Sequence, residues 1–203
     1  MKLPTHGLLG YFLARVFRWE GVRFRCVVAG AMAPDCPVIA AGIVAAATTL
    51  LETGSLEFVK FKAQMDLFYF FGWTLRSSHN LLHGPLSLAL LAALAATHLD
   101  AERRAPVLAF LAGAASHAAA DILTHVDDGP LLFWPLDWET RLAGPISHWD
   151  LDHGGLIVTI CECCAWVCAL LKVSPNPLPD LRLGRLWRSA GYPPVASMAA
   201  PRK

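Results

Sequence analysis

Long apolar stretches separated by short polar ones run along most of this chain, and the pattern predicts helices. In residues 115–125, alanine and leucine favour a helix, and neither glycine nor proline interrupts it. A first, shorter helix is expected from Thr5, a suitable N-cap, to about Phe17. The longer apolar runs cover residues 26–51, 81–99, 106–126 and 155–173, and His83, Gly84 and Pro85 interrupt the second run near its start. The pattern therefore predicts an all-α fold with about four hydrophobic helices.

The breaks between the apolar runs hold many of the polar residues. Pro34 and Pro37 flank Asp35, so Asp35 is expected at a helix boundary and not in mid-helix. Residues 127–153 form a long loop rich in glycine, proline, tryptophan and acidic residues, and loops of that length are usually functional. Residues 52–62 are polar and are expected to form a loop or a short amphipathic helix.

Composition favours a membrane protein. The chain has 203 residues, of which 55% are hydrophobic and 16% are charged, and its mean hydropathy is +0.45. No apolar run is a clean span of eighteen or so uncharged residues, because each long run carries one or two ionisable groups. Ionisable residues inside a membrane usually face a bundle interior or a wet cavity. We therefore expect a membrane-embedded helical bundle around a polar metal-binding pocket, with a soluble all-α domain as the alternative.

Charge is nearly balanced in total but unevenly placed along the chain. The net charge of +1 gives no indication of nucleic-acid binding. Basic residues gather near both ends of the chain, so the positive-inside rule places both termini in the cytoplasm. Both ends inside require an even number of spans, and we expect four. One domain is expected over residues 1–173, followed by a Pro-rich basic tail over residues 174–203.

Three ionisable groups share one face of the helix expected over residues 106–126. Steps of four residues rotate only about 40° around a helix, so His117, Asp121 and His125 stand above one another roughly 6 Å apart. Because an isolated buried charge is too costly, such a triplet must be paired, hydrated or metal-bound. The alternative is a polar packing network of satisfied core histidines.

Further candidate ligands recur at helix starts and in the long loop, where side chains can converge. The spacing His-x-x-x-acid occurs twice, in His117 with Asp121 and in His148 with Asp152. Imidazole nitrogen with carboxylate oxygen, without thiolate, suits zinc, manganese or iron, and a bridging aspartate commonly holds two cations. The predicted metal ligands are His6, Asp35, His79, His83, His117, Asp121, His125, His148 and Asp152.

The order of these ligands resembles that of zinc-dependent phospholipase C and P1 nuclease, which are all-α phosphoesterases with a three-metal cluster. More specifically, the chain resembles the bacterial inner-membrane proteins called membrane-bound metal-dependent hydrolases, a family that includes LexA-regulated members. The matching stretches are residues 5–7, 33–35, 76–79, 116–121, 132–135 and 144–150.

The chain departs from the family pattern near Arg76. The pattern there is His-Arg-x-x-Thr-His-Ser, and this chain has Leu75 and Asn80 at the first and last of these positions. His83 follows His79 by one turn and is an alternative ligand, so the choice between the two stays open.

The resemblance implies a multi-pass hydrolase of the bacterial inner membrane that acts on a lipid-like or other phosphoester. Two or three divalent ions, zinc first and manganese or iron as alternatives, would activate the attacking water. Asp121 is the expected bridging ligand and Asp35 a second ligand and candidate general base. Arg76 is a candidate phosphate clamp, or else a charge that sets topology. The alternative function is a non-enzymatic membrane protein with a structural or transported metal ion.

Overall fold

The computed structural model describes residues 2–173, and all regular structure within them is helical, as predicted. The expected tail over residues 174–203 lies outside the described residues, so the domain boundary stays a prediction. By packing, the chain divides into two compact units, Met1–Thr159 and Ile160–Lys203. The described part of the second unit is the later part of the last helix. Every site discussed below lies in the first unit.

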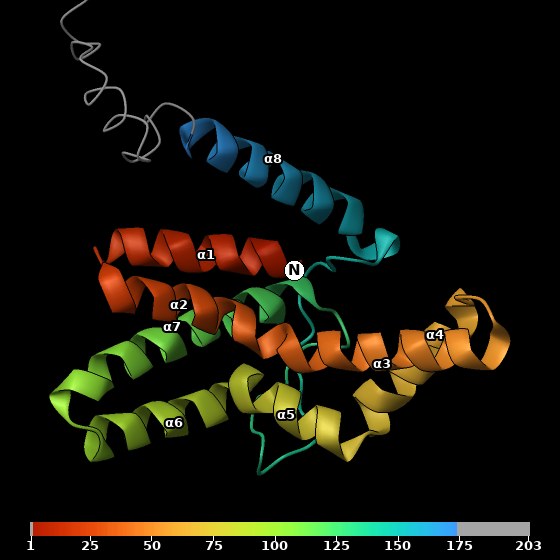
Figure 1. Ribbon diagram of the computed structural model, residues 1–203, viewed down its shortest axis with the longest axis horizontal. Helices are drawn as coiled ribbons and strands as arrows, with labels where there is room; N and C mark the ends of the chain where they lie inside the picture. The colour runs from red at the N-terminus through yellow and green to blue at the C-terminus, as the bar shows by residue number, and fades with distance from the viewer. Residues whose placement is uncertain (1, 174–203) are drawn as a thin grey trace, which may run out of the picture. The chain divides into compact units, whose positions relative to one another are not determined.

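The helices and short helical turns follow one another with few long connections. In chain order they are α1 (Leu3–Val16), α2 (Gly21–Met32), the 3₁₀ turn η1 (Ala33–Asp35), α3 (Cys36–Thr53), α4 (Phe58–Asp66), the π-helical turn η2 (Leu67–Phe71), α5 (Trp73–His83), α6 (Pro85–His98), α7 (Ala101–Thr124), the 3₁₀ turn η3 (Leu151–His153) and α8 (Gly155–Val173) (Figure 1).

The centre of the first unit is the packing of α1 and α2 on α7, which lie side by side in Figure 1. Two glycines allow the backbones of α2 and α7 to approach closely. A Cβ on Gly30 would collide with the carbonyl oxygen of Phe110, and one on Gly113 with that of Val27. Small residues at a helix crossing are the usual means of close packing between membrane helices. One buried apolar cluster joins the three helices through Ala14 of α1, Val27 of α2 and Ala109 of α7.

The predicted helix boundary at Asp35 is confirmed. The turn η1 interrupts the long helical segment between α2 and α3, and Asp35 is its last residue. Pro34 and Pro37 have no backbone N–H group, which explains why the ordinary helical hydrogen bonding breaks here. The side chain of Asp35 is therefore placed at a break next to α7.

The predicted interruption near the start of the apolar run over residues 81–99 is confirmed, and the run is shared by two helices. Its first residues belong to α5, which ends at His83, and α6 begins at Pro85 after a bend of 62°. Gly84 lies at the bend in a crowded position, since a Cβ there would lie 2.9 Å from Ser87 Oγ and 3.0 Å from the carbonyl oxygen of Asn80. The carboxyl end of α5 therefore lies at the bend, and α5 is in contact with α7.

The long loop after α7 is tied to the helices by hydrogen bonds. Asn80 Nδ2 donates to the carbonyl of Arg76 at 2.8 Å, and Asn80 Oδ1 accepts from the backbone N–H of Leu131 at 2.9 Å. The backbone N–H of His148 donates to the carbonyl of Thr124 at 3.0 Å. The loop is thereby returned to the carboxyl end of α7.

Two expected helix starts and one expected end were wrong. α1 begins at Leu3, so Thr5 lies inside the helix and is not its N-cap. α7 begins at Ala101, before the expected Pro106, because the side chain of Asp100 accepts from the N–H of Arg103 at 2.9 Å and caps the helix there. α7 ends at Thr124, so His125 lies just beyond it in extended conformation.

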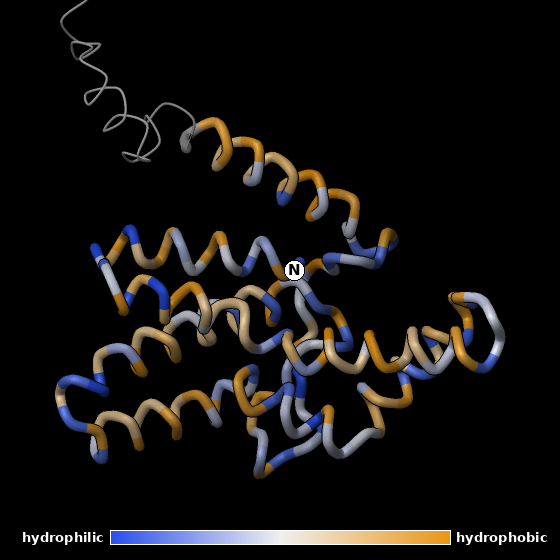
Figure 2. The backbone as a smooth tube through the Cα atoms, in the orientation of Figure 1, coloured by the Kyte–Doolittle hydropathy of each residue, from blue (hydrophilic) through white to orange (hydrophobic). Residues whose placement is uncertain are grey.

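Two helical segments are long and apolar enough to cross a membrane, Gly21–Thr53 and Ala101–Thr124. The bent pair α5 and α6 makes a third if it counts as one span. The described residues therefore give two or three candidate spans and not the expected four, because the apolar part of α8, Gly155–Leu171, is shorter than a span. In Figure 2 the apolar colouring extends along α3 and α6, and strongly polar colouring marks the connection between α6 and α7.

Candidate metal centre

The site is built around the carboxylate of Asp121, which lies on α7 and is 5% exposed. Its Oδ2 lies 3.0 Å from His117 Nε2 and 3.1 Å from His83 Nε2. Its Oδ1 lies 3.2 Å from His6 Nε2 and 3.8 Å from His125 Nε2. Imidazoles therefore face both oxygens of one carboxylate, and they come from α1, α5 and α7 and from the residue that follows α7.

Asp35 brings a second carboxylate to the Oδ2 side of Asp121. Its Oδ1 lies 3.4 Å from His117 Nε2. One donor atom from each of Asp35, His83, His117 and Asp121 lies within 4.8 Å of the other three. His117 and Asp121 lie one turn apart on α7, while the break at η1 and the bend after α5 supply the other two.

The histidines of the centre are almost completely buried. His6 and His117 are 0% exposed and His83 is 1% exposed. Within the described residues, no partner completes a hydrogen bond of acceptable geometry with His6 Nδ1, His6 Nε2, His83 Nδ1 or His117 Nε2. Since buried polar atoms without partners are costly, the Nε2 atoms of His6 and His117, which face carboxylate oxygens, need a metal ion or a proton to compensate them.

The tautomer of His117 indicates what must balance the lone pair on its Nε2. Its Nδ1 lies 2.7 Å from the carbonyl oxygen of Ala31, which can only accept, so Nδ1 carries the proton of that hydrogen bond. In the neutral imidazole Nε2 then has a lone pair, and this lone pair faces oxygens of Asp121 and Asp35. Such an arrangement is repulsive unless a cation lies between the three atoms or the imidazole is protonated.

The distances at the centre match those of a metal site. Contacts of 3.0, 3.1 and 3.4 Å separate nitrogen and oxygen donors around Asp121 Oδ2 and Asp35. Donors bound at about 2.0–2.1 Å to one tetrahedral zinc ion lie about 3.3 Å from one another. The donor set of imidazole nitrogen and carboxylate oxygen suits zinc, and also manganese or iron. The residues present therefore fit a divalent metal ion.

Asp128 orients His125 on the other side of Asp121. Its Oδ1 lies 2.7 Å from His125 Nδ1, its Oδ2 accepts from Trp149 Nε1 at 3.1 Å, and its carbonyl oxygen accepts from the Tyr69 hydroxyl at 2.7 Å. Partial burial would raise the pKa of Asp128, but the hydrogen bonds from His125 and Trp149 hold it below its usual range. The charged carboxylate thus fixes the proton of His125 on Nδ1 and leaves Nε2 directed at Asp121. Sequence reasoning missed Asp128, for which the spacing His-x-x-Asp was the available signal.

His148 lies beside His125, with 4.5 Å between the ring centroids. Burial lowers the pKa of His148 to about 4, so its imidazole is neutral at neutral pH and keeps a nitrogen lone pair. His79 lies behind His83, with 3.9 Å between the stacked rings, and it stands outside the group of four close donors. Of the two alternatives left open by the sequence, it is His83 that contacts Asp121.

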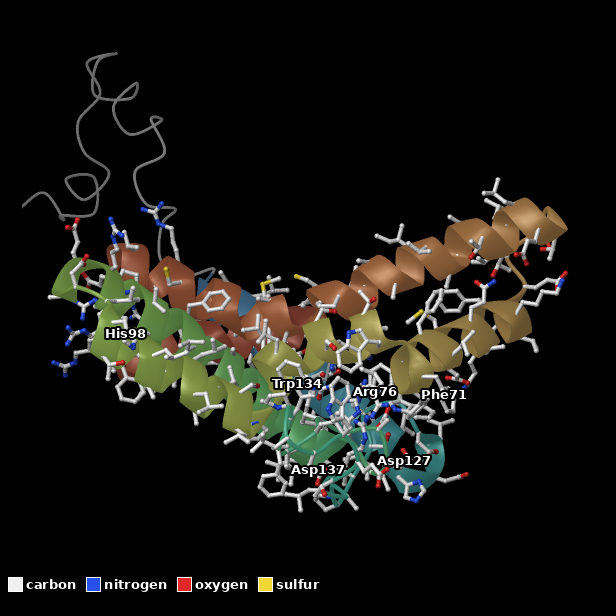
Figure 3. All side chains as sticks on the ribbon, turned by 90° about the horizontal axis from the view of Figure 1, so that it is seen from below. Phe71, Arg76, His98, Asp127, Trp134 and Asp137 are labelled. Carbon is white, nitrogen blue, oxygen red and sulfur yellow. The ribbon has the colours of Figure 1, made fainter. Side chains whose placement is uncertain are left out.

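Arg76 and Asp152 are placed away from the cluster. Arg76 donates to the carbonyl of Trp138 and lies over its ring, 5.3 Å from the ring centroid. Asp152 is exposed in η3, where its backbone N–H donates to Asp150 Oδ1 at 3.0 Å. His98 lies at the end of α6, far from Arg76 and Asp127 in Figure 3.

A cavity of about 600 Å³ opens beside the cluster, within the size range of ligand pockets. Asp35, His79, His83, Asp121, His125 and His148 line its polar end. Neither Arg76 nor Asp152 is among its lining residues in the described part of the chain. Lys62, which the sequence analysis did not single out, does line it.

The fold and the site define a class of protein: an all-helical membrane protein with a buried His/Asp cluster that could hold a metal ion. The chain matches the family model described as YdjM inner membrane protein over residues 1–178. It therefore belongs to the YdjM inner membrane protein family, which confirms the family resemblance and an inner-membrane location. No curated protein and no solved structure matches the chain.

Proposed function

We propose that this protein is a metal-dependent hydrolase of the inner membrane that cleaves a phosphoester with metal-activated water. The observation that carries the proposal is the position of His117 Nε2, which faces the carboxylates of Asp121 and Asp35 inside a buried cluster while Nδ1 donates to the carbonyl of Ala31. A catalytic role is favoured because Asp35, His83 and Asp121 of this cluster line a cavity large enough for a substrate.

The contacts of Asp121 suggest two metal positions that share this carboxylate. On the Oδ2 side, Asp35, His83 and His117 would hold the first ion. On the Oδ1 side, His6 and His125 are close, and His148 lies next to His125. Zinc is the first choice for both positions, with manganese or iron as alternatives.

Bound divalent ions would lower the pKa of water and offset negative charge on the phosphoryl group. Asp35 is the candidate general base, because its side chain is 21% exposed whereas that of Asp121 is 7% exposed. In the hydrolysis, a bond forms between the water oxygen and phosphorus and the ester P–O bond breaks. Asp35 accepts one proton of the water, and the leaving oxygen takes a proton from solvent.

The second candidate function is a structural or transported metal ion without catalysis. It is favoured by the complete burial of His6 and His117 and by the position of Arg76, the predicted phosphate clamp, outside the cavity. Both functions predict bound metal, and only the first predicts turnover of an ester.

The test uses the full-length protein loaded with zinc and bis-(p-nitrophenyl) phosphate or p-nitrophenyl phosphate as substrate. We expect Asp35→Asn to lower turnover at least a hundredfold while much of the zinc stays bound. The variant removes the catalytic base but keeps the shape of the side chain, so turnover should fall much more than zinc binding. His98→Ala is the matched control, because His98 is exposed at the far end of α6. The hydrolase proposal is rejected if the wild-type protein binds zinc but hydrolyses neither ester and no other phosphoester in a broad screen. The second function would then remain.

A further inference from the structure

The cavity beside the metal centre has an apolar wall that a small water-soluble substrate would not need. The wall is formed by Leu3 of α1, Val38 and Ile39 of α3, Met65 of α4 and Phe70 of η2. Val38 and Ile39 follow Asp35 within one turn of helix, so the apolar wall begins directly beside the metal ligands.

This wall is continuous with a surface suited to contact lipid. α3 belongs to the candidate membrane span Gly21–Thr53, and Ile39 both lines the cavity and is 42% exposed. Ile43 and Leu50 share the face of Ile39 on α3, and they are 66% and 51% exposed. An apolar chain could therefore pass from the bilayer along α3 to the metal centre without crossing water.

One cationic side chain lines the cavity, and it is paired with an acidic neighbour. Lys62 of α4 lines it, and in the described part of the chain it is the one lysine or arginine that does. Its Nζ pairs with Asp66 Oδ2 at 2.6 Å, and both side chains are about half exposed. The carboxylates of Asp35, Asp66, Asp121, Asp127 and Asp128 also line the cavity, so the divalent ions at the cluster, and not Lys62 alone, would attract a negatively charged headgroup, while the wall suits a hydrocarbon chain.

We propose that the substrate is an anionic amphiphile whose phosphoester headgroup lies at the metal centre and whose hydrocarbon chain lies against Val38, Ile39, Met65 and Phe70. The proposal rests on the proposed function and names the substrate class of the same site. Each methylene moved from water onto such a wall raises affinity by about fourfold, so a chain of several carbons gives a large and measurable preference.

The test measures binding with alkyl phosphonates, whose C–P bond resists hydrolysis. Methylphosphonate and octylphosphonate are titrated calorimetrically into zinc-loaded, full-length protein in nanodiscs. We expect octylphosphonate to bind at least tenfold more tightly than methylphosphonate. Ile39→Trp, which fills the cavity wall, should reduce this ratio below threefold. Ile43→Trp is the matched control on the same helix, and it should keep the wild-type ratio because Ile43 does not line the cavity.

Equal affinities for the two phosphonates would overturn the proposal. So would a chain-length preference that Ile39→Trp and Ile43→Trp affect equally, because it would reflect partition into the lipid. The zinc content of each variant shows that the centre is intact, and Val38→Phe fills the same wall if Ile39→Trp does not accumulate.

Failure of the amphiphile proposal and failure of the proposed hydrolase function give different results. Chain-length-dependent binding without hydrolysis of any phosphoester would support the amphiphile site and reject the hydrolase. Hydrolysis of a short, soluble phosphoester without chain-length preference would support the hydrolase and reject the amphiphile site.

Discussion

At the scale of single residues, the carboxylate of Asp121 connects the two halves of the centre. His83 and His117 approach one of its oxygens, and His6 and His125 approach the other. His117 and His125 direct Nδ1–H to the carbonyl of Ala31 and to Asp128, so they can also donate to Asp121 only if they carry positive charge, and burial opposes that charge. A shared cation removes the conflict, because neutral imidazoles then direct lone pairs and Asp121 directs its charge toward the metal.

Asp128 should determine how tightly the Oδ1 side of Asp121 holds a metal. Asp128→Asn keeps the shape of the side chain but removes the charge that fixes the proton of His125 on Nδ1. Loss of such an outer carboxylate typically weakens metal affinity by about 10–100-fold. We expect competition titration with a chelator to show this loss for one of the bound ions. Asp137→Asn, in the same loop, should leave affinity unchanged, and an equal loss in both variants would reject the assigned role of Asp128.

Asn80 should hold the long loop on α5. Asn80→Ala leaves the N–H of Leu131 buried without its acceptor, at a cost of about 1–3 kcal/mol. We expect a lower Tm in detergent. Ser78→Ala is the matched control, because its exposed hydroxyl bonds only carbonyls of its own helix, and it should change stability by less than about 0.5 kcal/mol. A Tm for Asn80→Ala equal to that of the control would contradict this account.

At the scale of helices, the close crossing of α2 and α7 positions the centre. Asp35 is the last residue of η1, which follows α2 directly, and His117 and Asp121 lie on α7 one and two turns after Gly113. The hydrogen bond between His117 Nδ1 and the carbonyl of Ala31 joins the same two helices. The separation of α2 and α7 therefore affects the relative positions of Asp35, His117 and Asp121, which are proposed metal ligands.

Gly30→Ala should disrupt this crossing. Its Cβ would collide with the backbone of Phe110, which cannot move as a flexible side chain can. Overpacking of this kind costs about 1–3 kcal/mol or more, so we expect a lower Tm and a lower metal content. Gly42→Ala on α3 is the matched control, since the nearest atom to its Cβ is Met65 Sδ at 4.0 Å, and it should be neutral or stabilising. Equal Tm values for the two variants would contradict the close crossing.

At the scale of the whole molecule, much of the fold could be predicted from sequence because its signals are local. Two prolines around Asp35 predicted the break, and helical periodicity placed His117 and Asp121 on one face. The last helix was predicted at its observed bounds, Gly155–Val173. These features depend on neighbouring residues alone.

Other features depend on tertiary contacts, which the sequence does not reveal. His83, at the end of α5, contacts Asp121 on α7, whereas His79 is not among the four close donors, and the sequence left open which of the two would approach Asp121. Arg76 has the spacing of the family pattern, but it contacts Trp138 of the returning loop. The role of Asp128 depends on Tyr69 and on the loop as well as on neighbouring His125.

The central claim is that the buried cluster binds metal, and the most direct test is the metal content per chain of detergent-purified, full-length protein by elemental analysis. We expect two or more zinc, manganese or iron ions per chain. Asp121→Ala should lose them, because it removes the carboxylate that both positions share, whereas His98→Ala should retain them. A wild-type chain that is purified without metal and does not bind added zinc, manganese or iron would contradict the account. In that case the histidines around Asp121 would form a protonated ion-pair network and not a metal centre.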